Sequence, residues 1–427
     1  MRRVRILAGA LAACLLSGCG ITGNVSVDEL LRAPVLSGQH SQVQKALNGY
    51  LGESAQLKYP ASGQGVSPFV FSDLDGDGTE DAAVLYTSAA KGQNVHLAVL
   101  EQEDGAWQVT QELEGLSTEL YSVDLAVMQD AAGSQLVVGY GSPQGDQYLA
   151  VYSYRDETLE CVLQENYDQY LLEDITGSGT QDLVLAAVGQ DGLHLKLLTA
   201  ADGAFQLVQE LEAGDSRFVG CVALSTSRGS DGAYYLVLDG RTGASSPYLA
   251  SSLFRYDARE HLLEAVPAPA GADLYGSTLR YYTSLLSADI DGDGAVEIPT
   301  QLPEGEGGIT SLAQEHRLSF VAWNSYTLRR TRRVSFGVLD EDHGFYLPLP
   351  MQWKGNVSLC DGSNGGWEVR SLEGDKLYLS VRLEPLDEDA GGYTRLATVG
   401  SQQVLARVGP DGGALRYAEL SGGIRVL

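Results

Sequence analysis

The sequence predicts an all-β protein, and within that class a β-propeller with four-stranded blades of about 50 residues each. Three observations predict it: a hairpin segment that occurs twice, short alternating strands separated by Gly/Asp/Ser turns after Pro60, and 51 glycines in 427 residues. Many glycines indicate many turns, and 44% hydrophobic residues suffice for a folded core. Besides the blades, we expect a short N-terminal helix and a small β-rich C-terminal domain.

The charge balance narrows the classes of partner. The chain has 28 Lys and Arg against 56 Asp and Glu, which gives a net charge of −28. Nucleic acids and anionic lipid surfaces would be repelled by this charge, so we exclude both as partners. The excess of carboxylates suits divalent cations, basic partners or solubility.

The N-terminus has the order of features of a secretory signal. Three arginines among the first five residues precede an apolar stretch from Ile6 to Leu16, which is too short to span a bilayer. The stretch ends in Leu16-Ser17-Gly18-Cys19, which resembles the lipobox of bacterial lipoproteins. The resemblance implies that residues 1–18 are removed and that Cys19 is lipidated, which anchors the protein outside the cytoplasmic membrane. An ordinary secretory signal that is cut nearby is the alternative.

A tether and one helix come next. Residues 19–40 are polar and rich in glycine, and we interpret them as a tether from the lipidated cysteine. Within residues 41–66, apolar residues from Val43 to Leu51 recur at helical spacing, and Ser41 and Gln44 form a capping-box pattern. We therefore expect an N-terminal helix that begins at Ser41, followed by a lead-in to the first blade.

One segment occurs twice without gaps: residues 96–114 align with residues 194–212. In each copy a strand leads through an Asp-Gly turn into a second strand, the pattern of a β-hairpin. The copies lie 98 residues apart, which corresponds to two blades of about 50 residues. We expect the hairpins in equivalent places two sheets apart, with Trp107 and Phe205 both buried between neighbouring sheets.

Weaker copies of the unit lie around these hairpins, at residues 119–163, 218–264 and from 283 onward. We therefore assign residues 67–335 to propeller repeats. Residues 344–427 fit the period poorly, although leucines and valines alternate with polar residues over 377–383, as on a half-buried strand. We expect residues 344–427 to form a small β-rich C-terminal domain, with additional blades as the alternative.

Three nine-residue acidic loops share one spacing, in which positions 1, 3, 5, 7 and 9 are the key positions. The first acidic loop, residues 73–81, has at these positions Asp73, Asp75, Asp77, Thr79 and Asp81. The second acidic loop, residues 174–182, is depleted and has Asp174, Thr176, Ser178, Thr180 and Asp182. The third acidic loop, residues 289–297, has Asp289, Asp291, Asp293, Ala295 and Glu297.

This spacing suits calcium. Alternate positions of a tight loop point toward one centre, glycines permit the turn, and crowded carboxylates repel one another unless a hard cation neutralises them. Calcium also accepts a backbone carbonyl at position 7, so Thr79 and Ala295 can serve whatever their side chains. We expect structural calcium in the first and third acidic loops, with a metal-free Asp/Gly turn as the alternative. In the second loop the two carboxylates make a weak site, and the metal-free turn is favoured.

The acidic loops are not EF-hands, because position 12 is Val84, Leu185 or Thr300 instead of glutamate and the flanks alternate as strands. A strand, an Asp/Gly loop and a strand inside a β repeat resemble the FG-GAP/VCBS repeats of integrin-α-type β-propellers. The chain lacks the Phe-Gly and Gly-Ala-Pro flanks that name this family. The resemblance implies a propeller with calcium in loops between blade strands, in a bacterial surface protein.

The sequence carries no Gly-x-Ser-x-Gly, His-Glu-x-x-His, phosphate-loop or dinucleotide-binding motif. The favoured function is a binding or scaffold module that presents a propeller face to a protein or glycan. One alternative is a propeller enzyme acting on polysaccharide, and another is a structural envelope protein without a diffusible ligand. Unpaired acids between aromatic walls would favour the enzyme, and a flat or solvated axis would favour the binder.

Overall fold

The computed structural model describes residues 38–63, 66–128, 133–212, 217–243, 248–267, 274–302, 317–362, 366–413 and 415–427. The expected signal, Cys19 and nearly all of the expected tether lie outside the described residues. Within these ranges, no helix is both long and apolar enough to cross a membrane.

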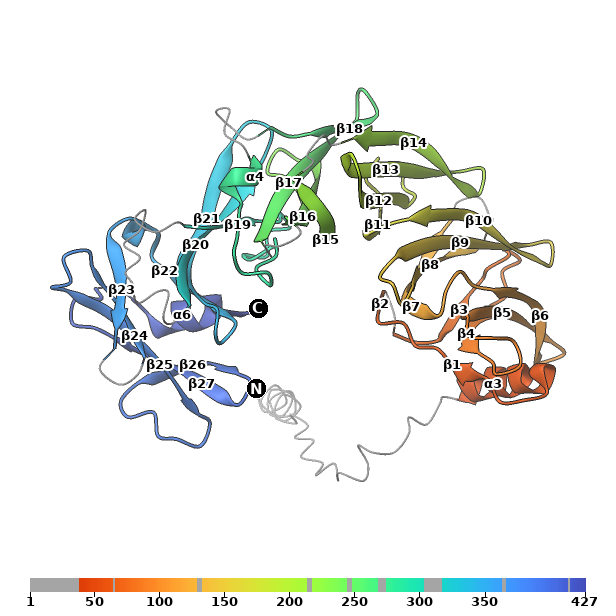
Figure 1. The fold of residues 1–427 in the computed structure, drawn as a ribbon, viewed down its shortest axis with the longest axis horizontal. Helices are drawn as coiled ribbons and strands as arrows, with labels where there is room; N and C mark the ends of the chain where they lie inside the picture. Colours follow the sequence, from red (N-terminus) through yellow and green to blue (C-terminus); the bar gives the residue numbers. More distant parts are fainter. Residues whose placement is uncertain are drawn as a thin grey trace, which may run out of the picture.

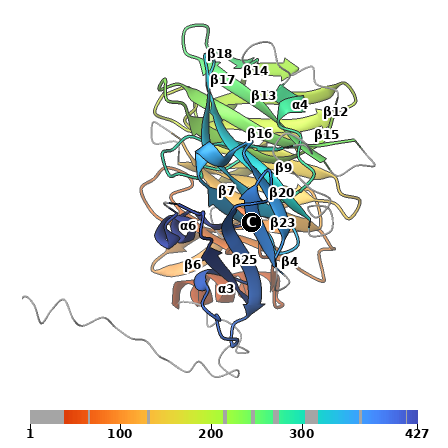
Figure 2. The same ribbon diagram turned by 90° about the vertical axis from the view of Figure 1, so that its left-hand side faces the viewer.

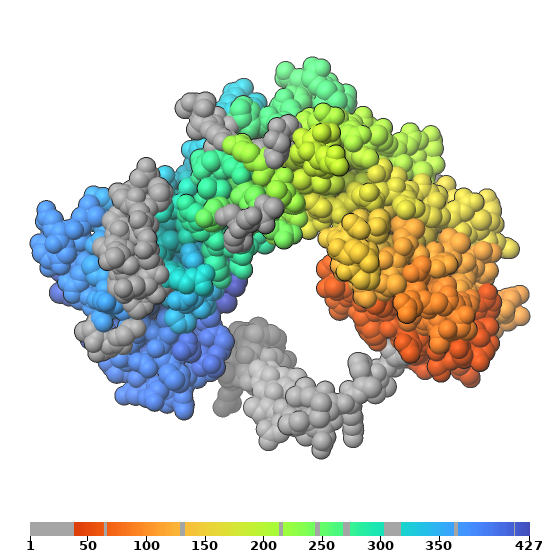
Figure 3. All heavy atoms as spheres, viewed as in Figure 1, coloured from red at the N-terminus to blue at the C-terminus, as the bar shows by residue number. Residues whose placement is uncertain are grey.

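Six sheets follow one another around an open ring in the order of the sequence (Figure 1). The ring opens between sheet 1, next to the N-terminal helix, and sheet 6, and Figure 3 shows the hollow that the sheets surround. Figure 2 shows the ring from the side of sheet 6, with β23 and β25 toward the viewer.

The first three sheets carry the duplicated hairpins. Sheet 1 contains β1 (Gln56–Leu57), β3 (Phe69–Ser72), β4 (Asp81–Thr87), β5 (His96–Glu103) and β6 (Ala106–Glu114). Sheet 2 contains β2 (Ser62–Gly63), β7 (Glu119–Val127), β8 (Ser134–Gly141), β9 (Gln147–Arg155) and β10 (Thr158–Asn166). Sheet 3 contains β11 (Gln169–Glu173), β12 (Asp182–Gly189), β13 (Gly192–Ala201) and β14 (Ala204–Glu212).

The last three sheets complete the ring. Sheet 4 contains β15 (Phe218–Arg228), β16 (Tyr234–Thr242), β17 (Tyr248–Asp257) and β18 (Leu262–Ala265), and the short helix α4 (Leu274–Ser277) follows it. Sheet 5 contains β19 (Ile298–Gln301), β20 (Leu318–Tyr326), β21 (Thr331–Asp340), β22 (Phe345–Leu349) and the C-terminal β28 (Arg425–Val426). Sheet 6 contains β23 (Val357–Asp361), β24 (Trp367–Ser371), β25 (Leu377–Pro385), β26 (Thr394–Val399) and β27 (Gln402–Val408).

The duplicated hairpins, β5–β6 and β13–β14, occupy equivalent places in sheets 1 and 3, as predicted. Asp104 and Asp202 have φ values of 52° and 49° and are followed by positive-φ glycines, as the tight Asp-Gly turn requires. Both hairpins also shift register at the same point, after Val99 in one copy and after Leu197 in the other. The duplication therefore preserves the bulge as well as the turn.

A hydrophobic core fills each space between neighbouring sheets, but these cores differ in size. Among the described residues, 15 buried side chains join sheets 1 and 2, 14 join sheets 3 and 4, and 18 join sheets 5 and 6 with the helix α6 (Tyr417–Gly423). Only 9 join sheets 2 and 3, and 6 join sheets 4 and 5, where a further cluster of 5 around Leu285 packs the connection between the two sheets onto sheet 5. The ring is therefore packed as three sheet pairs with thinner cores between the pairs.

The helix α3 (Gly38–Leu51) covers the face of sheet 1 that has no preceding sheet. Its buried residues Val43 and Leu47 pack with Trp107, which is 7% exposed, while Phe205 lies half-buried between sheets 2 and 3. The prediction that both rings lie between neighbouring sheets is therefore wrong for Trp107, because a helix takes the place of a neighbouring sheet there. The helix also begins at Gly38, so Ser41 lies inside it and not at its N-cap.

The strands of residues 344–427 divide between two sheets. β22 and β28 extend sheet 5, whereas β23 to β27 form sheet 6, which shares its core with sheet 5. This arrangement corresponds to the additional-blade alternative. One face of sheet 6 supplies Leu379 and Val381 to that core, while the opposite face carries polar residues, among them Ser380 and its exposed cross-strand neighbour Arg407. A polar outer face is typical of the terminal unit of a repeat array.

Candidate metal loops

The three acidic loops lie in alternate sheets. The first joins β3 to β4 in sheet 1, the second joins β11 to β12 in sheet 3, and the third directly precedes β19 in sheet 5. In all three, position 9 pairs with the residue before position 1, and these pairs are Asp81 with Ser72, Asp182 with Glu173, and Glu297 with Ala288. The loops are therefore structurally equivalent, although only two of them retain a full set of acids.

The carboxylate at position 1 shapes each loop by accepting backbone hydrogen bonds. Asp73 accepts from the amides of Gly76 at 2.7 Å and Gly78 at 3.0 Å. Asp289 accepts from the corresponding glycine amides at 2.7 and 2.9 Å. The glycines at positions 4 and 6 have φ values from 73° to 87° in the three loops, a region that favours glycine.

The acid at position 9 is buried beneath the loop. Asp81 is 3% exposed and accepts from the Leu74 amide at 3.0 Å, and Glu297 is 0% exposed and accepts from the Ile290 amide at 3.1 Å. The second oxygen of Glu297, Oε1, is buried and has no hydrogen-bond partner among the described residues. A buried carboxylate oxygen without a donor costs free energy unless a cation or water binds it, so this atom suits a ligand.

The structure brings positions 1, 3 and 9 together in two of the loops. One carboxylate oxygen from each of Asp73, Asp75 and Asp81 lies within 4.8 Å of the others, and the same holds for Asp289, Asp291 and Glu297. Three acidic oxygens this close are a donor set that calcium prefers. The residues present therefore fit a calcium ion.

Position 5 is placed differently from positions 1, 3 and 9. Asp77 accepts from the Thr79 amide at 2.6 Å and Asp293 from the Ala295 amide at 2.9 Å, and neither belongs to the cluster of close oxygens. Asp293 also forms an ion pair of 3.0 Å with Arg332, and both side chains are about half exposed. Asp293 thus has a protein cation as its partner, whereas Asp77 has none among the described residues.

The second acidic loop is held by its own hydrogen bonds. The carboxylate of Asp182 accepts from the amides of Ile175 at 2.9 Å and Thr176 at 2.8 Å, and from the Thr176 hydroxyl at 3.3 Å. Ser178 and Thr180 share a hydroxyl–hydroxyl hydrogen bond of 2.7 Å. This set of contacts matches a turn that needs no metal.

Burial makes the ionised form of the position-9 acids unfavourable. Burial is the main effect that raises the pKa of Asp81 to about 6, and the negative charges of Asp75, Glu101 and Asp77 add to it. Burial also raises the pKa of Glu297 to about 7, and the charges of Asp291, Asp293 and Asp289 add to this effect. Both acids therefore carry an electrostatic cost at neutral pH that a bound divalent cation would remove.

Two arginines contact the third acidic loop, and sequence reasoning missed both contacts. Arg332 pairs with Asp293, and Arg425 of β28 donates from Nη2 to the carbonyl of Ile290 at 2.9 Å. Arg425 lies 135 residues from Ile290, and nothing in the sequence pattern links the two.

A pocket, which we call the inner pocket, is lined by residues of β2, β7 and β11 between sheets 2 and 3. These three strands lie on the inner side of the ring (Figure 1). Its volume is about 570 Å³, and its walls include Tyr121, Tyr167 and Tyr170. Two of its three carboxylates are engaged: Tyr170 donates to Asp124, and Asp168 accepts from the amides of Cys221 at 2.9 Å and Val188 at 3.2 Å. The third, Glu173, is exposed, and its side chain has no hydrogen-bond or ion-pair partner among the described residues. Asp124 and Asp168 therefore stabilise the contacts of sheet 3 with sheets 2 and 4.

No protein-family model matches the chain, and no curated protein matches it. Similar solved structures include levansucrase from Bacillus subtilis, with 10% identity and a TM-score of 0.27 over 75% of this chain and 88% of that one. A levansucrase variant from B. megaterium has 12% identity and a TM-score of 0.26 over 79% and 96% of the two chains. A protein from Lactobacillus plantarum has 12% identity and a TM-score of 0.32 over 75% and 93%. TM-scores this low support neither a family nor an activity, so it is the chain's own ring of six sheets that defines it as a β-propeller.

Proposed function

We propose that this chain is a calcium-stabilised propeller of the FG-GAP/VCBS kind that acts as an extracytoplasmic binding or scaffold module. The observation that carries the proposal is the gathering of acidic oxygens at positions 1, 3 and 9 of two equivalent loops, each with a buried acid at position 9. The partner is a protein or a glycan, since the net charge of −28 disfavours nucleic acid.

Calcium has a structural role in this proposal. Asp73, Asp75 and Asp81 would hold one ion and Asp289, Asp291 and Glu297 a second, with the carbonyls of Thr79 and Ala295 completing the sites. When bound, the ion neutralises the carboxylates and stiffens the loop. The stiffened first and third acidic loops would then fix the strands that they adjoin in sheets 1 and 5, and so the surface that these sheets present to a partner.

Calorimetric titration of chelator-treated protein with calcium tests this assignment. We expect two sites per chain, with Asp75→Ala and Asp291→Ala each removing one of them. Asp174→Ala is the matched control and should leave both sites, because the second acidic loop is held by its own hydrogen bonds. A wild-type protein that takes up no calcium would show that the loops are ordinary turns.

The polysaccharide enzyme remains the second candidate because the inner pocket combines tyrosines with carboxylates. The engagement of Asp124 by Tyr170 and of Asp168 by two backbone amides favours the binding module instead, because general acid–base catalysis by a pair of acids needs two carboxyl groups that are free to exchange protons with substrate. Among the described residues that line this pocket, only Glu173 offers such a free carboxyl group. Release of reducing ends from polysaccharide by the wild type, but not by Glu173→Gln, would favour the enzyme.

The lipid anchor at Cys19 is a separate part of the proposal. Because Cys19 follows Leu16-Ser17-Gly18, we expect wild-type protein in a bacterial host to incorporate labelled fatty acid and to sediment with membranes. Cys19→Ala should lose the label and remain unprocessed or be released. Lipid labelling with membrane fractionation measures both effects, and label in the Cys19→Ala protein would contradict the anchor.

A further inference from the structure

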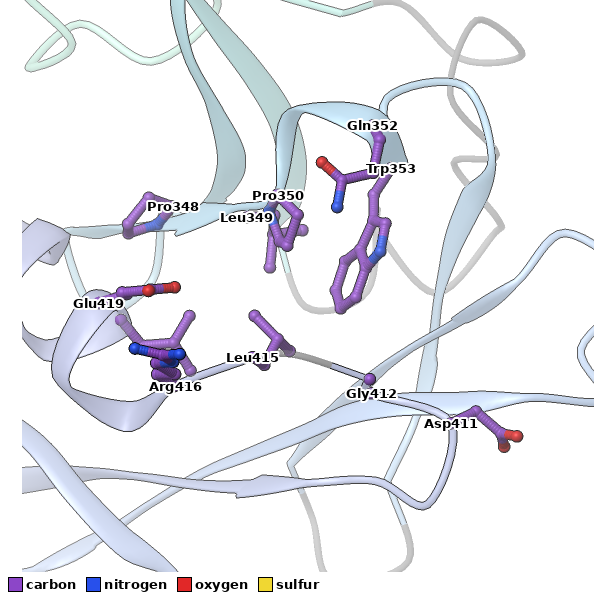
Figure 4. Close-up of a pocket in the computed structure, with 12 residues that line it drawn as sticks. Pro348, Leu349, Pro350, Gln352, Trp353, Asp411, Gly412, Leu415, Arg416 and Glu419 are labelled. Carbon is purple, nitrogen blue, oxygen red and sulfur yellow. The ribbon is translucent and has the colours of Figure 1, made fainter.

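A cavity of about 640 Å³ lies where sheets 5 and 6 meet α6, and we call it the Trp353 pocket (Figure 4). It is formed by the end of β22, the 3-10 helix η2 (Met351–Trp353), the connection after β27, and α6. Its apolar wall includes Pro350, Trp353 and Leu415. This volume lies within the range of pockets that bury small ligands, so it can take a ligand of several rings.

The indole of Trp353 is held on one side and open on the other. It packs on the ring of Tyr378, with centroids 4.8 Å apart and planes inclined by 32°. Figure 4 shows the indole along the wall of the pocket, beside Pro350 and facing Leu415. The fixed ring therefore offers a preorganised apolar platform to a flat ligand.

Planar polar groups surround this platform. Gln352, Arg416 and Glu419 are exposed at the pocket, and within the described part of the chain their side chains form no hydrogen bond or ion pair. An amide, a guanidinium and a carboxylate together offer donors and acceptors that can each bind two neighbouring hydroxyls. The rim thus suits a neutral ligand with several hydroxyl groups.

The apolar indole and the polar rim together complement the surface of a pyranose sugar. A sugar ring with equatorial hydroxyls has an apolar C–H face for the indole and a polar edge for the rim. A polyproline peptide could also pack on the indole, but it carries no N–H donor for the carboxylate of Glu419. We propose that the Trp353 pocket binds a gluco-configured pyranose of an oligosaccharide; this inference rests on the proposed binding function and names its ligand class.

Tryptophan fluorescence gives a direct measurement, because Trp353 is the only one of the four tryptophans with appreciable exposure. The other three, Trp107, Trp323 and Trp367, are 7, 1 and 3% exposed. With cellotetraose or chitotetraose as probe, we expect a saturable change in emission and protection of Trp353 from acrylamide quenching. Trp353→Ala should abolish binding measured by calorimetry, and Trp353→Phe should retain weaker binding.

A second variant and a control keep the test independent of folding. Glu419 is exposed, so Glu419→Gln should fold normally yet weaken binding about tenfold by removing the charged acceptor. Tyr281→Ala removes another exposed ring, at 53% exposure, outside the pocket and should leave binding unchanged.

Two results would overturn the inference: neither sugar changes the emission, or a decaproline peptide binds in their place. Because the pocket shares no residue with the acidic loops, Trp353→Ala should keep its two calcium sites. Loss of calcium uptake by the wild type would therefore count against the proposed function, whereas absence of sugar binding with intact calcium uptake would count only against this inference.

Discussion

Replacing Asp239 with alanine is expected to lower the free energy of unfolding by about 3–5 kcal/mol, because it leaves a buried arginine without its counter-charge. Asp239 lies in β16 and is 1% exposed, and its partner Arg280 is 0% exposed, with Nη2 and Oδ1 2.9 Å apart. Asp239 also accepts from the hydroxyls of Ser251 and Ser287 at 2.5 and 2.8 Å and from the Ser287 amide at 2.6 Å. The network ties the chain before the third acidic loop to sheet 4.

Chemical denaturation of three variants measures this effect. Asp146→Ala, at an exposed acid, is the control and should change stability by less than about 0.5 kcal/mol. The double variant Asp239→Leu with Arg280→Met removes both charges and should recover part of the loss. A loss below about 1 kcal/mol for Asp239→Ala would mean that water enters the site and solvates Arg280.

Removal of calcium by a chelator is expected to lower the melting temperature of the protein. An ion that binds only the folded state contributes about 3 kcal/mol at a hundredfold excess over its dissociation constant. Asp75→Ala and Asp291→Ala should each reduce the response to calcium, while Asp174→Ala should barely alter it. Calcium should stabilise more than magnesium, because a site with many oxygens suits the larger ion. Melts with calcium, magnesium and chelator measure these differences, and a wild type indifferent to all three would contradict the calcium sites.

The calcium-free protein should also lose stability as the pH rises. The folded-state pKa values of about 6 for Asp81 and about 7 for Glu297 lie above the values of about 4 expected in the unfolded chain. The folded state therefore holds these protons more tightly, and stability falls as the pH rises through the folded pKa values. The difference in melting temperature between calcium and chelator should widen from pH 5 to pH 8. A constant difference over this range would show that the two acids do not respond to the ion.

Features decided by neighbours along the chain were predictable. The Asp-Gly turns at Asp104 and Asp202 need only two residues that tolerate positive φ, and the alternation of apolar residues along β25 needs only a sheet with one buried face. The acidic spacing likewise placed positions 1, 3 and 9 close together, because a nine-residue loop closes on itself. It did not reveal that the acids at position 5, Asp77 and Asp293, lie outside these clusters and accept hydrogen bonds from backbone amides.

Features decided by distant partners were not predictable from the sequence. The pairing of β28 with β22 joins Val426 to Phe345, and the contact of Arg425 with the third acidic loop depends on that return of the chain. The Trp353 pocket likewise needs η2, the connection after β27 and α6 to meet. The covering of Trp107 by α3 depends on the absence of a preceding sheet, which no local pattern records.

The uneven cores between sheets have a mechanical consequence. We expect each pair of sheets to move as a unit and the ring to flex most easily between sheets 2 and 3, where the core is thin. Between sheets 4 and 5 the core is also thin, but the Asp239–Arg280 network and the cluster around Leu285 add contacts there. The inner pocket lies between sheets 2 and 3, so we expect a change in the width of the ring to alter its shape. The Trp353 pocket lies within the pair formed by sheets 5 and 6, whose shared core is the largest, so we expect the same change to leave its platform and rim in place.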